Sequence, residues 1–342
     1  MSGGVTIALD RLKGREAAAL VVDGQLEDLL VDADAPRPGT IYRAIADRPV
    51  KGQGGMFLRT PEGAAFLRQV KGIAPGQALL VQVTGHAEPG KAIPVTARLL
   101  FKSRFAIVTP GAPGHNIARG IRDGALRAEL QGIARDTMGD SDMGLILRSA
   151  CETGSPDDIA ADIAAMRDLA ETVAADPSGP GAEKLLEGDG PHDRAWRDWP
   201  TPDTLESGEG CFEALGILDR IDALLAPQVA LPGGAHASIE PTRALVAVDV
   251  NTGPDTSPAA GLKANLALVR DLPRQLRLRG LGGQITLDLA PMPKKDRQVV
   301  EEALRAALRR DEVETTLAGW TPLGHFELQR QHARPPLAGI LR

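Results

Sequence analysis

The sequence is poor in aromatic residues and in cysteine. Of its 342 residues only six Phe, three Trp and one Tyr are aromatic, so we expect cores built from Leu, Val, Ile and Ala. The two cysteines, Cys151 and Cys211, form no CxxC pair and cannot make a disulfide framework or a cysteine zinc site. This usage is typical of a reducing compartment, and we therefore expect a cytoplasmic protein.

Long apolar segments are also missing. No apolar run approaches the roughly 18 to 20 residues that a membrane-spanning helix needs, so no membrane segment is expected. The first residues, MSGGVTIALDRLKG, lack a basic start followed by an apolar block, and a secretory signal is not expected. With 43% hydrophobic and 25% charged residues, the chain has the composition of two or three globular domains.

The charge is unevenly distributed along the chain. The formal net charge of −6 is by itself atypical of a nucleic-acid-binding protein. Residues 151–210 hold fifteen acidic and four basic side chains, a local charge of −11, whereas residues 261–310 hold five acidic and eleven basic ones, a local charge of +6. This asymmetry indicates a protein that meets a polyanion on one face. Solvated, charged helix surfaces would give the same counts, so both interpretations stay open.

Glycine, proline and the periodicity of apolar residues divide the first two thirds of the chain. Residues 1–32 are expected to form short strands with a turn at Asp23-Gly24. Residues 41–100 carry several short strands separated by Gly and Pro, the pattern of a small barrel. The Pro-, Gly- and Asp-rich residues 176–210 predict a linker or surface loop. The other expected elements are strands at 105–110 and 144–150 and helices at 124–134, 157–175 and 211–226.

The final third alternates between strand and helix patterns. The expected elements are a strand at 244–250, a helix at 262–279, a strand at 284–289, a helix at 296–310 and a strand-like segment at 324–328. This order is typical of a layered α/β unit.

Two aspartates interrupt the apolar strands of this unit. Asp249 lies in ALVAVDVNTG and Asp288 in QITLDLAPM, and we expect such apolar strands to be buried on both faces. A strand, a helix and a neighbouring strand would bring the two carboxylates side by side, where repulsion requires a shared proton or a cation. Mg²⁺ suits such a pair because it prefers oxygen ligands and keeps several waters, one of which Asn251 could orient. The alternative is that either aspartate merely caps a helix or a turn.

Four blocks of the final third, in this order and spacing, resemble the catalytic core of the ribonuclease E/ribonuclease G family. They read TRALVAVDVNTG, NLALVRDLPRQLRLRGLGGQITLDLAPM, DRQVVEEALRAALRRD and LGHFELQRQ. Earlier, GTIYRAIADRPVKGQGGMFLRTPEGAAFLRQ and ALLVQVTGHAEPGKAIPVTARL resemble the family's OB-fold RNA-binding insert. DMGLILRSA resembles the segment that binds the 5′-monophosphate of RNA. The resemblance covers nearly the whole chain and is strongest at residues 240–342.

The resemblance implies a multi-domain α+β protein with an OB-fold β-barrel insert and an α/β layered nuclease core. The five expected segments are N-terminal strands of a ribonuclease-H-like subdomain at 1–35, the OB-fold insert at 36–102, a 5′-end sensor at 103–175, an acidic linker with a shortened ribonuclease-H-like remainder at 176–230, and a metal-dependent nuclease subdomain at 231–342.

For catalysis, the resemblance implies an Mg²⁺-dependent endoribonuclease that cleaves single-stranded RNA to 5′-phosphate and 3′-hydroxyl ends. Asp249 and Asp288 match the family's two magnesium-ligating aspartates, and Asn251 matches the asparagine that holds them in place. Ribosomal RNA precursors, messenger RNA and small RNAs are all open as substrates.

Three residues of the expected barrel match the family's RNA contacts. Phe57 and Phe66 match its stacking aromatics, and Lys91 matches a basic residue that contacts backbone phosphate. Exposed rings stack on unpaired bases, so two aromatics within ten residues are suggestive in a chain with so few. Ordinary barrel core is the alternative for the two phenylalanines, and a solvated loop residue is the alternative for the lysine.

The sensor segment supplies a second set of matches. Arg148 and Ser149 match the family's Arg-Thr pair, in which a guanidinium and a hydroxyl bind the 5′-phosphate. Arg119 stands where the family has another basic residue of the sensor. Arg277 and Arg279 lie near the end of an expected helix and either contact RNA phosphates or complement the helix C-terminus.

The sequence also departs from the family. It has no zinc-binding CxxC, so zinc-linked dimerisation is not expected, although an oligomer is possible. The stretch DEVET, with Glu312 and Glu314, stands where relatives are basic, LDLAPM lacks a second acid, and Pro273 predicts a kink in its helix. A weakly catalytic or non-catalytic RNA-binding protein of the same family is therefore the alternative. Retention of two acids that need neutralising favours the enzyme.

Overall fold

A computed structural model describes residues 4–50, 54–68, 72–88, 90–177, 179 and 181–341. The chain divides into two compact units. Residues 34–201 form the first, here called the central unit, and residues 1–33 together with 202–342 form the second, the split unit. The five-segment division expected from the sequence stays a prediction.

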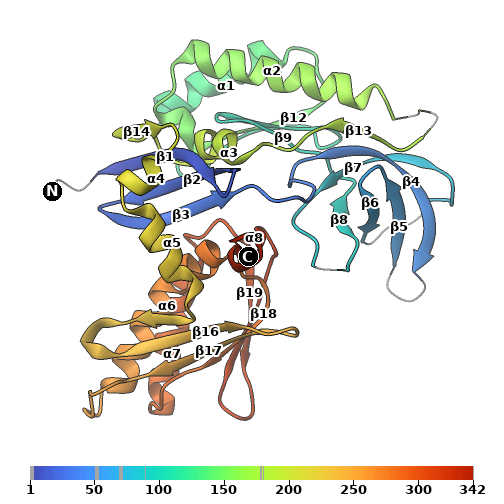
Figure 1. Cartoon of the computed structure of the whole chain (residues 1–342). Helices are drawn as coiled ribbons and strands as arrows, with labels where there is room; N and C mark the ends of the chain where they lie inside the picture. Colours follow the sequence, from blue (N-terminus) through green and yellow to red (C-terminus); the bar gives the residue numbers. More distant parts are fainter. Residues whose placement is uncertain are drawn as a thin grey trace. The chain divides into compact units, whose positions relative to one another are not determined.

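The first half of the central unit is a closed β-barrel. Its strands run in the order β13-β4-β5-β6-β8-β7, and an additional pairing of β4 with β7 closes the ring (Figure 1). The closed ring consists of β4, β5, β6, β8 and β7, with β13 paired to β4 alone, and aliphatic side chains fill the interior around Tyr42. The predicted barrel is confirmed. The strands are β4 (Ile41–Val50), β5 (Gly55–Thr60), β6 (Gly63–Leu67), β7 (Ala78–Val83), β8 (Ile93–Thr96) and β13 (Glu183–Leu186).

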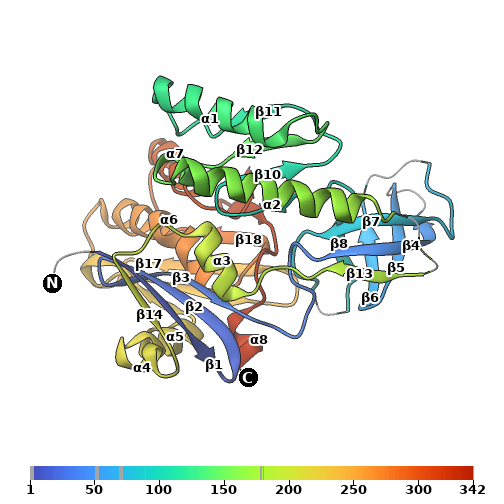
Figure 2. The same cartoon turned by 90° about the horizontal axis from the view of Figure 1, so that it is seen from above.

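The other half of the central unit is a four-stranded sheet with two long helices packed on it. Figures 1 and 2 show the helices side by side along the sheet, whose strand order is β11-β12-β10-β9. The side chain of Asp123 caps the first helix, and Ser155 followed by Pro156 begins the second. Both helices lie where the sequence predicts them. The elements are β9 (Phe101–Lys102), β10 (Ala106–Thr109), β11 (His115–Ile117), α1 (Gly124–Met138), β12 (Gly144–Leu147), η1 (Ser149–Glu152) and α2 (Pro156–Ala174).

Residues 176–210 are not the loop that their composition predicts. β13 pairs antiparallel with β4 of the barrel, a helix α3 (Pro191–Asp198) follows, and β14 (Thr204–Ser207) pairs in parallel with β1 (Val5–Leu12). Each element has only four to eight residues, too few for a recognisable apolar period. Its hydrogen-bonding partners lie far away in sequence, so local composition does not reveal it.

The split unit begins with a small sheet of order β14-β1-β2-β3. β1 continues through a tight turn into β2 (Arg15–Val22), and the predicted turn at Asp23-Gly24 leads into β3 (Gln25–Val31). Asp23 and Gly24 have φ values of 50° and 75°, the left-handed conformation that two-residue hairpin turns require. The helix predicted at 211–226 is divided into α4 (Cys211–Ala214) and α5 (Ile217–Leu225), because Gly216 adopts a left-handed conformation between them.

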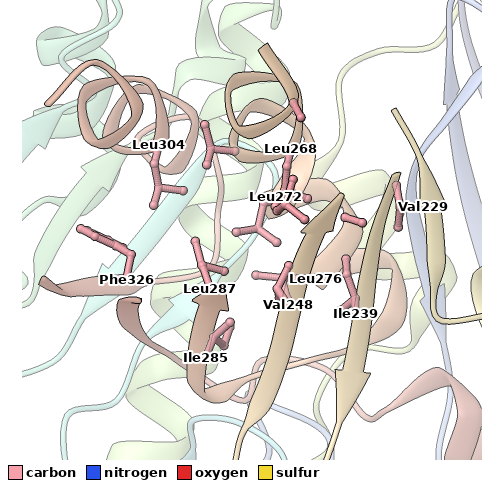
Figure 3. Close-up of a cluster of buried hydrophobic side chains, with 14 of the residues drawn as sticks. Val229, Ile239, Val248, Leu268, Leu272, Leu276, Ile285, Leu287, Leu304 and Phe326 are labelled. Atoms are coloured by element: carbon pink, nitrogen blue, oxygen red, sulfur yellow. The ribbon is translucent and has the colours of Figure 1, made fainter. Parts of the chain in front are cut away.

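A six-stranded sheet of order β15-β16-β17-β18-β20-β19 dominates the split unit. Figure 3 shows leucines of α6 and α7, including Leu268, Leu272 and Leu304, packed on Val248 and Leu287 of the central strands. The elements are β15 (Gln228–Ala230), η2 (Pro232–Gly234), β16 (His236–Pro241), β17 (Val246–Asn251), α6 (Ala260–Arg279), β18 (Gly283–Asp288), η3 (Lys294–Asp296), α7 (Arg297–Leu308), β19 (Thr315–Trp320), β20 (Phe326–Arg330) and α8 (Leu337–Leu341).

The helices cover this sheet on one face only. Along β17, residues alternate strictly between buried and exposed, so the prediction of burial on both faces is wrong. The reason is that α6 and α7 pack on the same side as Val246, Val248 and Val250, which leaves the opposite side uncovered by helices. We call this opposite side the open face. α6 runs as a single helix through the buried Pro273.

A buried ion network ties the small sheet of the split unit to the six-stranded sheet. Arg277 on α6 pairs with Asp311 at 2.5 Å and with Glu27 at 3.0 Å, and Arg330 on β20 pairs with Asp311 at 2.5 Å. The side chains of Arg330 and Asp311 are each only 1% exposed. Arg279 bonds Gln275 and a backbone carbonyl. Both helix-end arginines are therefore engaged in contacts inside the protein.

Candidate functional site

Asp249 and Asp288 lie directly beside each other on the open face. β17 and β18 are parallel neighbours, and their register pairs Asp249 with Asp288. Adjacent strands are about 4.8 Å apart, so the two side chains leave the sheet as neighbours. Both residues are exposed, and the Asp288 side chain retains 67% of its accessible surface. The predicted juxtaposition is confirmed, but the carboxylates face solvent and are not buried.

Asn251 follows Asp249 on the same face. The two residues are separated by one buried valine, and the Asn251 amide nitrogen Nδ2 donates a 3.4 Å hydrogen bond to Asp249 Oδ2. An amide in this position restrains the rotation of the carboxylate without adding charge. The structure thus brings together all three residues that the sequence singles out for catalysis.

The row of polar residues extends to the strands on either side. On β16, Ser238 is the register partner of Asp249, and its hydroxyl donates to Glu240. Before β20, His325 places Nε2 at 3.8 Å from Asp288 Oδ1. Neither Ser238 nor His325 is among the site residues predicted from the sequence. The signal for His325 is its place in LGHFELQRQ, immediately before the strand that pairs with β18.

The loop after Asp288 is fixed by a buried asparagine on α6. Asn265 is fully buried, and its side chain donates to Ala290 O and accepts from Ala290 N, each at 2.9 Å. One turn earlier, a Cβ added to Gly261 would come within 2.0 Å of Pro291 O, so only glycine allows this approach. Neither residue is among those predicted from the sequence, although a polar residue inside the apolar face of a helix is a signal that could have indicated Asn265.

The residues of this face fit a hard divalent cation that retains water. Two adjacent carboxylates provide oxygen ligands, and the described residues contain no cluster of three or more His, Cys, Asp or Glu that would enclose an ion. Mg²⁺ is typically held by one or two carboxylates, with waters and substrate phosphate completing its shell. The hydroxyl of Thr286, two residues before Asp288, is buried without a hydrogen-bond partner among the described residues. The open face therefore offers the ligands of an incomplete site.

Phe57 and Phe66 form a pair on the outside of the barrel. They are register partners on β5 and β6, with ring centroids 5.2 Å apart, and the guanidinium of Arg48 lies over the Phe57 ring at 5.1 Å. Neighbouring residues along both strands are buried, whereas both rings are half-buried, so they are not ordinary barrel core. A Cβ added to Gly55 would approach Phe66 Cζ to 2.3 Å, so glycine makes room for the ring.

Lys91 lies in the loop before β8. Its ammonium pairs with Glu88 at 2.7 Å, and its side chain is 65% exposed. β8 is the parallel neighbour of β6, with Pro94 opposite Phe66. The loop that carries Lys91 thus leads into the strand next to the aromatic pair.

Arg148 is held at the end of β12 by a cluster of charged groups. Its Nη1 donates to the carbonyls of Ser103 and Arg197, and its Nη2 pairs with Asp198 at 2.8 Å. Ser149, which begins η1, is exposed. Arg119 is exposed as well, and it follows β11, which is parallel to β12. The chain segments that carry the three predicted sensor residues therefore leave the sheet at the same edge.

The comparisons with known proteins assign the chain to a family of RNA-processing enzymes. The model of the Ribonuclease E/G family matches residues 101–207 and 203–333. The chain belongs to this family, and the resemblance noted in the sequence is confirmed.

Curated relatives agree over nearly the full chain. Ribonuclease E of Nostoc sp. (strain PCC 7120) is 26% identical over 92% of this chain, and ribonuclease E of Synechocystis sp. (strain PCC 6803) is 27% identical over 92%. The chain spans about half the length of these two relatives, 54% and 55%. Ribonuclease G of Salmonella typhimurium is 25% identical over 94% of this chain and 79% of its own length. No described helix has the length and apolar character needed to cross a membrane.

Proposed function

We propose that this chain is an endoribonuclease that hydrolyses phosphodiester bonds within single-stranded RNA and uses Mg²⁺. The observation that carries this proposal is the register pairing of Asp249 with Asp288 on the open face, with Asn251 bonded to Asp249. A chain that only bound RNA would gain nothing from two adjacent carboxylates, because they repel each other and the phosphates of the ligand. Membership of the Ribonuclease E/G family supports the same reaction.

In this proposal Asp249 and Asp288 hold the ion, and Asn251 keeps the Asp249 carboxylate in its ligating orientation. When bound, Mg²⁺ lowers the pKa of a coordinated water and stabilises negative charge on the scissile phosphate. Ser238 and His325 flank the two carboxylates and line the path of the substrate. The proposed products carry a 5′-phosphate and a 3′-hydroxyl.

The central unit contributes the RNA-binding surfaces. Phe57 and Phe66 stack unpaired bases, and Lys91 contacts backbone phosphate. Arg148, Ser149 and Arg119 bind a 5′-terminal monophosphate, which gives preference to RNA with that end. Arg148 makes three hydrogen bonds within its own cluster, and a guanidinium has five N–H donors, so it retains capacity for a phosphate.

The test is cleavage of a 5′-monophosphorylated, A/U-rich oligoribonucleotide by the purified chain. We expect cutting with Mg²⁺, and we expect Asp249→Asn and Asp288→Asn to abolish it while RNA binding is retained. Glu327→Gln, a neutralisation on the neighbouring strand, is the control for a general charge effect. A wild-type chain that binds this RNA but fails to cut it with any divalent metal would instead be an RNA-binding protein of the family.

The proposed 5′-end preference has its own measurement. Wild-type protein should cut 5′-monophosphorylated RNA faster than the same RNA with a 5′-hydroxyl, and Arg148→Ala should reduce that ratio. Equal wild-type rates on the two RNAs would remove the sensor assignment and leave the nuclease assignment standing.

A further inference from the structure

Trp196 on α3 is an exposed aromatic residue in a chain that has few aromatics. It is 58% exposed, and no other aromatic of the described residues belongs to the exposed large hydrophobic side chains. The guanidinium carbon of Arg104 lies 4.6 Å from the centroid of its ring. Arg104 covers one side of the indole, and more than half of the residue's surface remains exposed. An exposed ring of this kind can stack on an unpaired nucleobase.

Arg104 is held rigidly against the ring. Its Nη1 donates to the backbone carbonyl of Trp196, and its Nη2 donates to Thr201 Oγ1 at 2.9 Å. The arginine therefore bonds the backbone of the residue whose ring it covers. A stacked guanidinium and indole fixed in this way form a preorganised surface, so little conformational entropy is lost when a ligand binds.

Next to this pair, three more cations converge on one carboxylate. Lys102, Arg148 and Arg197 each lie 2.8 Å from Asp198, the residue two positions after Trp196. Arg197 also pairs with Asp189. With Arg104, the cluster has four positive and two negative side chains. Three of the four cations, Lys102, Arg104 and Arg148, lie outside residues 151–210, the stretch that carries a charge of −11.

Asp198 keeps the cations together. Its side chain is only 10% exposed, whereas Lys102 is 37% exposed. The carboxylate thus fixes the ends of three long side chains, of which Lys102 is the most exposed, and the three cations outnumber it. A phosphodiester backbone complements such a surface.

We propose that Trp196, Arg104 and Lys102 form a second surface for single-stranded RNA, on which the indole stacks one nucleobase and the two cations contact the adjoining phosphates. This surface is separate from the aromatic pair of the barrel, and it lies beside Arg148, at the edge where a 5′ end is proposed to bind. The inference rests on the proposed function, since it takes RNA as the ligand. A protein partner is disfavoured because interface centres are depleted of lysine.

The binding test uses the full chain in the Asp249→Asn background, so that RNA is not consumed. The probe is a twelve-nucleotide, 5′-monophosphorylated, A/U-rich RNA, and its dissociation constant is measured by fluorescence anisotropy. We expect Trp196→Ala to weaken binding about tenfold and Trp196→Phe, which keeps a ring, to weaken it less than threefold. Arg104→Gln should weaken binding and reduce its salt dependence, since one phosphate contact is lost.

A second readout follows the indole itself. RNA should quench tryptophan fluorescence in the parent protein, and this quenching should be lost in Trp196→Phe, because Trp199 is buried and Trp320 packs against Phe326 and the core of the six-stranded sheet. Val299→Ala, an exposed apolar residue on α7, is the matched control and should change neither signal. Unchanged thermal midpoints would show that the variants fold.

Two results would overturn the inference. If Trp196→Ala binds RNA as the parent does while Phe57→Ala does not, the surface is not an RNA site, and the proposed nuclease function is untouched. If Trp196 fluorescence changes with protein concentration without RNA, and Trp196→Ala alters the oligomeric state in sedimentation, the surface joins two copies of the chain. Failure of the proposed function is separate, since it would appear as absent cleavage by the wild-type chain.

Discussion

The side chain of Asn265 and the backbone of Ala290 form a reciprocal pair of hydrogen bonds, each 2.9 Å long. This pair joins the first turns of α6 to Ala290, two residues after Asp288 in the loop that follows β18. Since α6 follows β17 in sequence, one buried amide links the helix after β17 to the loop after β18. The site therefore depends on a residue that does not belong to it.

Asn265→Ala removes both of these bonds and leaves the N–H and the carbonyl of Ala290 buried without partners. We expect it to lower the free energy of unfolding by about 2 to 4 kcal/mol, and to reduce the cleavage rate at saturating RNA more than the RNA affinity. Urea unfolding and single-turnover cleavage measure the two effects. Gln298→Ala, which removes an exposed amide on α7, should change stability by less than about 0.5 kcal/mol. A stable variant with normal cleavage would show that the clamp is dispensable.

Metal removal separates catalysis from RNA binding. After treatment with EDTA, the chain should lose cleavage but retain its affinity for RNA, because the proposed RNA contacts lie mainly in the central unit. Added Mg²⁺ should restore cleavage, and Ca²⁺, which accepts more ligands at longer distances, should restore less. Isothermal titration with Mg²⁺ alone should show a site that Asp249→Asn abolishes. Full cleavage in EDTA would refute the metal assignment.

Two ion pairs of similar length, one buried and one exposed, test how burial affects the contribution of an ion pair to stability. Asp311→Ala leaves Arg277 and Arg330 without their shared carboxylate in the interior, and should destabilise the chain by about 3 to 5 kcal/mol. Arg305→Ala breaks an exposed 2.8 Å pair with Glu301 on α7 and should cost at most about 0.5 kcal/mol. Denaturant unfolding of both variants gives the comparison. Equal effects would mean that the buried network contributes little.

The cluster around Asp198 predicts a stability difference that depends on pH. Burial by itself raises the pKa of Asp198, but the hydrogen bond and charge of Arg197 and the charge of Lys102 outweigh it and hold the pKa below its ordinary value. A carboxyl whose pKa is lowered by folding stabilises the protein above its unfolded pKa of about 3.9, and this contribution is lost as the pH falls further. The thermal midpoint of the wild type should therefore exceed that of Asp198→Asn at pH 7, and the gap should narrow below about pH 4. A gap that is constant between pH 7 and pH 3 would contradict this.

The two thiols should report on unfolding. Burial raises the pKa of Cys151 to about 11, and the same cause raises the pKa of Cys211 to about 11. At pH 8 the thiolate fraction, and with it the alkylation rate, should fall about a hundredfold below that of an ordinary cysteine. Iodoacetamide labelling followed by mass spectrometry should find both residues unmodified in the native chain and labelled in urea. As the urea concentration rises, Cys211 should be labelled before Cys151, because Cys211 is only partly buried. Rapid native labelling of Cys151 would contradict its burial.

The sequence alone is sufficient to predict the structural features that depend on neighbouring residues. Asp23 and Gly24 specify a tight turn, Ser155 and Pro156 begin a helix, and the apolar spacing of 262–279 predicts α6 nearly to its bounds. The residues of four sequence blocks also indicate the family and the three residues Asp249, Asn251 and Asp288. These features are local because backbone preferences and capping bonds act over a few residues.

Only the tertiary structure decided which side of the sheet the two aspartates occupy, where residues 176–210 find their hydrogen bonds, and how Asp198 gathers its cations. Packing of α6 and α7 on a single face left the carboxylates exposed, which an apolar strand does not reveal. β14 is a strand because β1, about two hundred residues away in the chain, offers it an edge. The free energy of such contacts comes from pairing and burial between segments that are distant in the sequence. A local sequence pattern therefore does not predict them.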